Sequence, residues 1–339
     1  MKHIIGVIPA PALPQVKSLL VDEDDAGQRL DNFLMRHLKG VPKTHVYRII
    51  RSGEVRVNKG RAQADTRIEA GDVVRLPPVR ISERVAEKSQ AMADSVARGA
   101  PAREFTVLFE DDCLLAIDKP AGVAVHGGSG VSFGVIEQLR MARPQAKFLE
   151  LVHRLDRETS GILLIAKKRS ALTHLQNQFR ERETGKTYLA LVAGKWPANK
   201  KVLDKPLHKF LLPDGERRVK VTTRDDPDGM PSVTLVKVRP SSASQFSLLE
   251  VTIKTGRTHQ IRVHLASEGH PIAGDDKYGD FELNKLLQRT GGLPALKRMF
   301  LHAWRLHLTH PVSGEPLALL TPLPPELAAF ADRATPSES

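Results

Sequence analysis

The chain has 339 residues, of which 41% are hydrophobic and 27% are charged, so it can form one large domain or two smaller ones. Lysine and arginine number 51 against 39 aspartate and glutamate, and the net charge of +12 favours a polyanionic partner such as nucleic acid. A charge that serves only solubility is the alternative. The single cysteine excludes a disulfide framework and a cysteine-based zinc site, and no apolar run reaches the roughly 18 residues of a membrane span. We therefore expect a cytoplasmic protein that does not enter the membrane.

The N-terminal region predicts a disordered lead followed by a small folded unit. Residues 1–16 contain a short apolar stretch broken by three prolines, without the hydrophobic region of a signal peptide. Residues 17–80 then predict two helices, because apolar residues recur at helical spacing at positions 30, 33, 34 and 38 and again at 46, 49 and 50. Asn58-Lys59-Gly60 predicts a hairpin turn, and "AGDVVRLPP" predicts a short closing strand.

Basic residues gather on the polar faces of the two predicted helices. They are Arg29, Arg36, Lys39, Lys43, Arg48 and Arg51. Such a face can contact RNA phosphates, or it can be a solvated charged surface. The pattern "RLDNFLMRHL…SGEVRVNK" resembles the S4 RNA-binding module over about 60 residues. This resemblance favours RNA, and the residues that it implies in binding are Arg29, Lys43, Arg48 and Arg51.

The rest of the chain predicts a linker, a larger domain and a tail. Residues 81–104 are polar and rich in alanine and serine, which is typical of a linker. Over residues 105–328, strands come in runs with interspersed helices and no regular β-α-β alternation, which predicts an α+β domain on a mostly antiparallel mixed sheet. Residues 329–339 predict a disordered tail. The expected strands lie near 162–166, 187–193, 219–222, 233–238, 246–253 and 300–308, and the expected helices at 132–141, 170–182, 258–268 and 282–289.

The stretch "LVHRLDRETSGILLIAKK", residues 151–168, places Asp156 between Arg154 and Arg157. A nearby arginine favours the ionised form of a carboxylate, and an ionised carboxylate can act as a nucleophile or a base. The polar segment precedes a buried strand, which is a common location for a functional residue on a rigid support. The alternative is an ion-paired turn whose charges only orient the loop.

The stretch "KTGRTHQIRVHLASEG", residues 254–269, is a second candidate. Thr258 is expected to cap a helix, with Arg257 at the helix start and Arg262 beside its apolar face. A helix N-terminus attracts anions, and arginines there would strengthen phosphate or carboxylate binding. An amphipathic helix that merely carries basic residues is the alternative.

Other residues with possible chemistry are isolated. Tyr188, in the predicted strand "KTYLALVAGKW", can stack on an unstacked base or belong to the core. Cys113 lies in the apolar run "CLLAI" and is expected to be core rather than a nucleophile. His259 and His264 are five residues apart and do not form an i, i+4 metal pair, so we expect no metal site. The loop "HGGSG", residues 126–130, lacks the Lys-Ser/Thr of a phosphate-binding loop, so we expect no nucleotide cofactor.

Five motifs taken together resemble the RluA-type pseudouridine synthases. In chain order they are "EFTVLFEDDCLLAIDKPAGVAVHGGSGVSFGVIEQLR", "HRLDRETSG", "KTYLALV", "TGRTHQIRVH" and "LHAWRLHLTHP". With the S4-like module, the resemblance covers residues 20–325. It implies that a uridine in RNA is flipped into a cleft, its N-glycosidic bond is broken, and the uracil is rotated and rejoined through carbon, without a cofactor. Asp118 stands where asparagine is more usual, and we expect a loop role for it and no loss of activity.

The resemblance also implies roles for individual residues. Asp156 is implied as the catalytic carboxylate, which attacks the sugar or the pyrimidine or abstracts a sugar proton. Tyr188 is expected to stack on the flipped base, and Arg262 to pair with Asp156 and keep it ionised. Arg154 is expected to fill the space of the flipped base or bind a phosphate, and Leu301 to pack under the pyrimidine. The expected RNA-binding residues of this domain are Arg154, Arg157, Arg257 and Leu301.

Within this family, four stretches favour members that act on large-subunit ribosomal RNA. They are "KGVPKTHVYRIIRSGEVRVNKGR", "AVHGGSG", "FLELVHRLDR" and "DDKYGDFEL". We expect a monomer, because no strong coiled-coil pattern or exposed apolar stripe is evident. The alternatives are a synthase for another rRNA or tRNA uridine, and a non-catalytic ribosome-assembly factor that binds rRNA.

Overall fold

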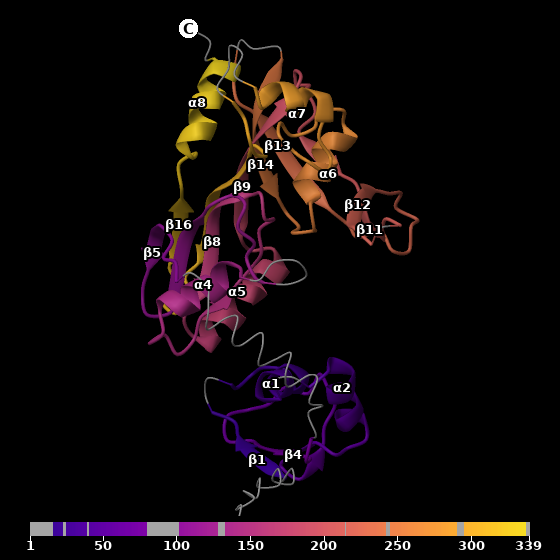
Figure 1. The fold of residues 1–339 in the computed structure, drawn as a ribbon, viewed down its shortest axis with the longest axis vertical. Coiled ribbons are helices and arrows are strands. Elements are labelled where there is room, and N and C mark those ends of the chain that lie inside the picture. Colours follow the sequence, from indigo (N-terminus) through magenta and orange to yellow (C-terminus); the bar gives the residue numbers. More distant parts are fainter. Residues whose placement is uncertain are drawn as a thin grey trace, which may run out of the picture. The chain divides into compact units, whose positions relative to one another are not determined.

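The computed structural model describes residues 16–22, 25–38, 41–79, 102–127, 133–213, 215–241, 245–289 and 295–336 (Figure 1). The chain forms two compact units, divided between residues 100 and 101. The predicted lead up to residue 15, the predicted linker from 81 to 101 and Lys39 lie outside the described residues. No helix in the described part of the chain is long and apolar enough to cross a membrane.

The N-terminal unit is a four-stranded antiparallel sheet with two helices. Its strands lie in the order β1-β4-β2-β3, and the apolar residues predicted on the helices, apart from the partly buried Leu38, are buried in one cluster with Val21, Val55, Ile68 and Val74. Asn58 and Lys59 both have positive φ, at 48° and 68°, as a two-residue hairpin turn requires. The predicted helices and hairpin are therefore confirmed. The elements are β1 (Lys17–Leu20), α1 (Leu30–His37), α2 (Lys43–Arg51), β2 (Arg56–Val57), β3 (Gly60–Arg61) and β4 (Val73–Leu76).

The C-terminal unit is built on a ten-stranded sheet in which only the pairing of β15 with β8 is parallel. The path runs β10-β13-β14-β9-β15-β8-β6-β5, with β16 paired to β15 and β7 to β8. This is the mostly antiparallel mixed sheet that the sequence predicts. The strands are β5 (Val107–Glu110), β6 (Leu114–Lys119), β7 (Glu150–Leu151), β8 (Ser160–Ala166), β9 (Gly185–Ala193), β10 (Val202–Asp204), β13 (Val233–Val238), β14 (Phe246–Ile253), β15 (Leu301–Thr309) and β16 (Pro316–Leu320).

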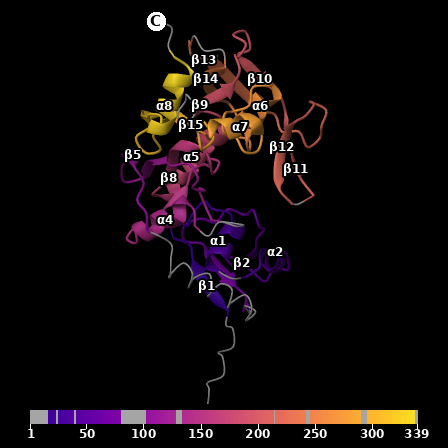
Figure 2. The same cartoon turned by 45° about the horizontal axis from the view of Figure 1, so that its top comes forward.

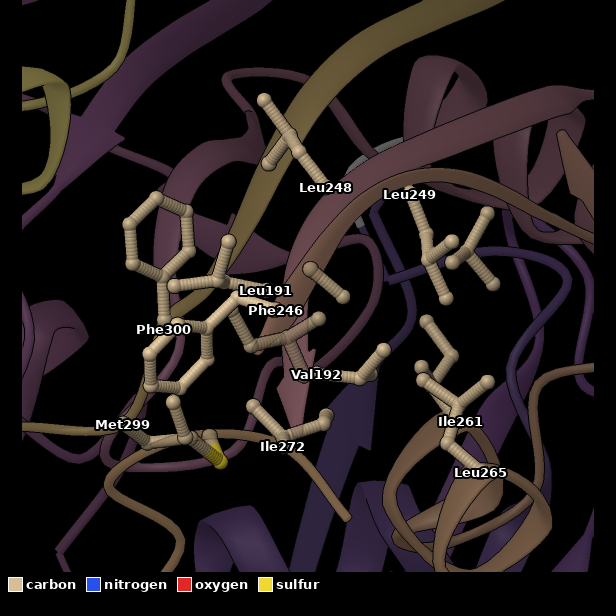
Figure 3. Packing of buried hydrophobic residues seen from close by; sticks show 14 of the residues in the cluster. Leu191, Val192, Phe246, Leu248, Leu249, Ile261, Leu265, Ile272, Met299 and Phe300 are labelled. Atoms are coloured by element: carbon tan, nitrogen blue, oxygen red, sulfur yellow. The ribbon is translucent and has the colours of Figure 1, made fainter. Parts of the chain in front are cut away.

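Helices pack on this sheet and a separate hairpin extends from it. Figure 3 shows Leu191, Phe246 and Phe300 packed together, with Ile261 and Leu265 in the same cluster. In Figures 1 and 2, the hairpin of β11 and β12 lies beside helix α6. The helices are α4 (Val135–Ala142), α5 (Arg169–Glu181), α6 (Gln260–Ser267), α7 (Phe281–Leu287) and α8 (Pro325–Ala334), and the hairpin consists of β11 (Leu207–Leu211) and β12 (Arg217–Val221).

The predicted disordered tail is wrong for residues 329–334, which belong to helix α8. The helix buries Leu327, Phe330 and Ala331, and the ring of Phe330 meets that of Phe246 edge-on at 6.1 Å. The polar end of the chain hides this apolar spacing, since composition alone does not register a three- or four-residue period. Residues 337–339 lie outside the described part of the chain.

Candidate active site

The loop that carries Asp156 runs between β7 and β8, and Lys119 hydrogen-bonds its backbone. The ammonium group of Lys119 donates hydrogen bonds to three backbone carbonyls: those of Pro120 and Val123 at 2.8 Å, and that of Arg157 at 3.1 Å. The amide of Gly122 donates to the Arg157 carbonyl as well, at 2.9 Å. Lys119 is fully buried, so its three N–H groups fix the backbone of two loops at once.

The glycine that ends "HRLDRETSG" allows β8 to meet β15. Gly161 has a φ of +109°, and a Cβ atom on it would lie 2.3 Å from the backbone oxygen of Ala303. Ala303 is its partner in the parallel pairing of β8 with β15. Only glycine permits both this conformation and this close approach. The Asp156 loop is therefore anchored to the centre of the sheet.

The guanidinium next to Asp156 belongs to Arg262, as the family resemblance implies, and not to the flanking arginines. The distance from Arg262 Nη1 to Asp156 Oδ2 is 3.2 Å, and the two side chains are 4% and 26% exposed. Arg157 instead donates to the Gly122 carbonyl at 3.0 Å and pairs with Glu158, and Arg154 is exposed. The explanation that the flanking arginines charge Asp156 is therefore wrong, because consecutive side chains in a turn point in different directions.

Arg262 is itself clamped by a second carboxylate. Its Nε and Nη2 atoms donate to the two oxygens of Asp275, each at 2.7 Å, and Asp275 also accepts from the amides of Lys277 and Tyr278. Burial opposes the charge on both groups, but these hydrogen bonds outweigh it, so the pKa of Arg262 lies above and that of Asp275 below its ordinary value. The clamp fixes the guanidinium in front of Asp156.

His259 and Tyr278 complete this side of the site. His259 Nε2 lies 4.0 Å from Asp156 Oδ2, and its Nδ1 is 2.8 Å from the Tyr278 hydroxyl. The Tyr278 ring centre lies 5.2 Å from the Arg262 guanidinium carbon. Burial lowers the pKa of His259, so the ring is neutral at pH 7. Asp275, His259 and Tyr278 were not predicted as site residues; the acidic and aromatic pattern of "DDKYGD" was the available signal for two of them.

The predicted Thr258 cap of helix α6 is wrong. The N-cap residue is His259, in the left-handed conformation with φ 53°, and its side chain does not cap the helix. The Gln260 side chain instead accepts hydrogen bonds from the Arg257 amide at 3.1 Å and from the Thr255 hydroxyl at 2.7 Å. The turn before α6 therefore depends on a side chain from inside the helix.

Asp156, Arg262 and His259 line a cavity of about 520 Å³. Tyr188 on β9 forms one wall, and burial together with the Asp156 charge raises the pKa of its hydroxyl, so it stays protonated. Arg154, Arg257 and Leu301 also line the cavity, whereas Arg157 is not among its described lining residues. The cavity is large enough for a nucleoside, and Asp156 is the only acidic residue in its described lining.

The cavity is also lined by His153, Phe179 and Lys186. The rings of His153 and Phe179 stack with centroids 4.9 Å apart at 16°, and His153 Nε2 accepts a hydrogen bond from the Leu164 amide at 3.2 Å. Burial lowers the pKa of His153 to about 4, so this histidine is neutral at pH 7. This part of the cavity thus combines aromatic surface with one lysine.

Cys113 is buried, as predicted, and burial raises the pKa of its thiol to about 11, which argues against a nucleophile. Two groups of side chains in the described residues come close enough to hold a metal ion, and neither lies in this cavity. They are Asp111 with Cys113 and His310, and His208 with Asp226 and Asp228. Residues 128–130 of the "HGGSG" loop lie outside the described part of the chain.

In the N-terminal unit, the predicted RNA-binding residues differ in whether a carboxylate within the unit accepts hydrogen bonds from them. Lys43, Arg48 and Arg51 are exposed on α2. Arg29 is exposed as well, but it donates to the carboxylate of Asp31 at 3.1 and 2.8 Å, and this interaction raises the pKa of Arg29 and ties its side chain to Asp31. A cavity of about 490 Å³ lies beside α2 and includes Arg51.

Comparison with known proteins agrees with this arrangement. Residues 113–267 match the model of the family described as RNA pseudouridylate synthase, and residues 28–74 match the S4 domain. A Pasteurella multocida protein named ribosomal large subunit pseudouridine synthase C is 51% identical over 312 residues, which is 92% of both chains. An Escherichia coli K12 protein of the same name is 52% identical and covers 91% of this chain and 94% of its own.

A solved structure has the same fold. Human RNA pseudouridylate synthase domain containing 4 superposes with a TM-score of 0.55 at 26% identity, covering 74% of this chain and 97% of that one. The family match spans the Asp156 loop, Tyr188 and Arg262, and the curated relatives are similar over almost the whole length. The chain therefore belongs to the RNA pseudouridylate synthase family.

Proposed function

We propose that this RNA pseudouridine synthase modifies uridines of large-subunit ribosomal RNA, with Asp156 as its catalytic carboxylate. The observation that carries the assignment of Asp156 is its position 3.2 Å from a clamped arginine, as the only carboxylate in the described lining of a nucleoside-sized cavity. The ribosomal substrate is supported by the names of the relatives that are 51% and 52% identical to this chain.

The reaction is an isomerisation within one nucleotide. The bond from the sugar carbon C1′ to N1 of uracil breaks, a bond from C1′ to C5 forms, and a proton leaves C5 while N1 takes one up. No atom is gained or lost, so the reaction consumes no co-substrate, oxidant or reductant. Asp156 supplies the ionised oxygen that acts on the nucleoside, and Arg262 keeps that oxygen charged when the bound base excludes water.

The other cavity residues position the everted nucleotide. Tyr188 provides an aromatic face for the uracil, and Leu301 packs against it, since an unstacked base is commonly held by stacking on side chains. Arg154 and Arg257 bind the phosphates of the strand. In the N-terminal unit, Lys43, Arg48 and Arg51 add affinity for the RNA backbone, and Arg29 contributes less because Asp31 holds it.

Incubation with an in vitro transcript of large-subunit ribosomal RNA tests the proposal. Wild type should create carbodiimide-dependent reverse-transcription stops, and Asp156→Asn should create none while its Tm and its Kd for the transcript stay unchanged. Measurable turnover by Asp156→Asn would refute the assigned residue. If the stops appear in tRNA instead, the substrate assignment fails. If wild type produces no stops in any RNA, the proposed enzymatic activity fails.

We also propose that the enzyme acts as a cytoplasmic monomer. Support for the monomer comes from the site itself, because Asp156, Tyr188 and Arg262 belong to one chain and line one cavity without a second copy. Sedimentation of the purified protein should give a single species of 37.4 kDa. A dimer at micromolar concentration would contradict this.

A further inference from the structure

Lys186 lies deep in the cavity and has no role in the assignment above. It stands two residues before Tyr188 on strand β9, so both side chains project from the same face of the sheet. The residue is 8% exposed and lines the same cavity as Asp156. Its ammonium nitrogen lies 5.1 Å from the centre of the Phe179 ring.

The ammonium group of Lys186 has no hydrogen-bond acceptor and no anionic partner among the described residues. The other deeply buried lysine of this unit, Lys119, shows what a structural role looks like, because all three of its N–H groups reach carbonyl oxygens. Burial lowers the pKa of Lys186, as it lowers that of Lys119 in spite of its three acceptors, so the missing hydrogen-bond partner is what distinguishes Lys186. Lys186 therefore has hydrogen-bonding capacity left for a ligand.

The charges around the cavity indicate what this ligand brings. Four described lining residues carry cationic side chains, namely Arg154, Lys186, Arg257 and Arg262, and Asp156 is matched by Arg262. His153, beside Lys186, is neutral at pH 7 because burial, and secondarily the charge of Lys186, lowers its pKa. A uridine nucleoside is neutral, and the anionic groups of an RNA strand are its phosphates.

We propose that Lys186 binds a phosphodiester oxygen next to the everted uridine and so helps to hold the nucleotide in the cavity. This inference rests on the proposed function, since it takes an RNA strand as the ligand. The aromatic stack of His153 and Phe179 lines the lysine's side of the cavity, where the low dielectric strengthens a charge-assisted hydrogen bond.

The first test measures RNA binding as a function of KCl concentration, with a fragment that the wild type modifies. Lys186→Met, which keeps the apolar stem, should bind about tenfold more weakly and should flatten the slope of log K against log salt by about 0.7 to 0.9. Lys186→Arg should restore most of the affinity. Lys195→Met, the same change at an exposed residue just beyond β9, is the matched control and should leave both quantities close to wild type.

The second test identifies the group that is bound. In a set of RNA fragments, each fragment replaces one phosphate near the target uridine by a neutral methylphosphonate. One of these fragments should bind wild type about tenfold more weakly, but should bind Lys186→Met as tightly as the unsubstituted fragment does. The proposal is overturned if every methylphosphonate weakens RNA binding by both proteins equally. It is also overturned if Lys186→Met has a reduced single-turnover rate with an unchanged Kd, because the lysine would then act on the base. If Lys186→Met has a lowered Tm, the RNA affinity of Lys186→Arg is compared with that of wild type instead.

These outcomes are separate from those of the proposed function. Pseudouridine formation by wild type on unmodified transcript tests the reaction and the substrate, and it does not depend on Lys186. If wild type is active and the methylphosphonate scan shows no coupling, only the inference on Lys186 fails.

Discussion

The basic residues proposed to bind RNA on α2 and the charged pair beside Asp156 differ in burial. On α2 of the N-terminal unit, Lys43, Arg48 and Arg51 are exposed to solvent. In the C-terminal unit, Arg262 and Asp275 are 4% and 1% exposed and bind each other through two hydrogen bonds. Exposed charges give graded affinity that salt screens, whereas a buried pair becomes costly once one partner is lost. The comparison assigns affinity to the first unit and catalytic geometry to the second.

The largest effect is expected for Asp275→Asn, which removes the buried charge that holds Arg262. Arg262 would lose its fixed orientation in front of Asp156, so the single-turnover rate should fall at least about 100-fold, with the Kd for RNA within a few-fold of wild type. The rate is measured with saturating enzyme on the unmodified transcript that wild type converts. The variant should also have a lower Tm, because it leaves a buried guanidinium partly unpaired.

Asp276→Asn is the matched control for that variant. Asp276 also contacts Arg262, with 3.4 Å between the two polar atoms, but its side chain is 70% exposed. The same change of charge at this neighbouring position should reduce the rate only a few-fold. Equal rates for the two variants would show that burial of the pair does not distinguish them, and the comparison between the units would lose its basis.

A smaller effect concerns the stability of the cavity wall in acid. The pKa of His153 is about 4 in the folded protein, against an ordinary value of 6.5. Between pH 6.5 and 4, the unfolded chain therefore binds a proton on this histidine that the folded protein does not bind. The contribution of neutral His153 to the free energy of unfolding is fully present above pH 6.5 and is lost as the pH falls towards 4. It amounts to on the order of 3 kcal/mol in total. The Tm of His153→Gln should therefore decrease less than that of wild type between pH 7 and 4.5.

His174→Gln provides the control for this pH dependence, because His174 is exposed on α5. Its Tm should decrease with falling pH by as much as that of wild type. If His153→Gln also follows the wild-type curve, the histidine is not a source of acid lability, and the neutral character of this wall would need another explanation.

The smallest effect is expected on α2, where Arg48→Gln and Arg51→Gln each remove one exposed charge. Each change should weaken RNA binding only a few-fold and flatten the salt slope by about 0.7 to 0.9, since one phosphate contact is lost. The rate at saturating RNA should remain that of wild type. A rate reduced as strongly as in Asp275→Asn would contradict the division of labour between the units.

Local patterns predicted much of the secondary structure. The apolar spacing on α1 and α2 and the hairpin turn at Asn58 and Lys59 needed no information from elsewhere in the chain. At the C-terminus, the polar composition predicts a tail, whereas the spacing of Leu327, Phe330 and Ala331 forms the buried face of helix α8. The Thr258 cap failed because Gln260 hydrogen-bonds the preceding turn from inside the helix.

By itself, the sequence determined the family, the fold class and the identity of Asp156, Tyr188 and Arg262 as candidates, because these depend on residue types in a fixed order. The family resemblance also implied the pair of Arg262 with Asp156, but only the tertiary structure decided the other charge contacts. Arg262 reaches Asp156 from a helix 106 residues further along the chain, Asp275 clamps it, and Lys186 is left without an anion. Contacts of this kind depend on how strands and loops distant in sequence come together, and no local pattern of residues encodes that distance.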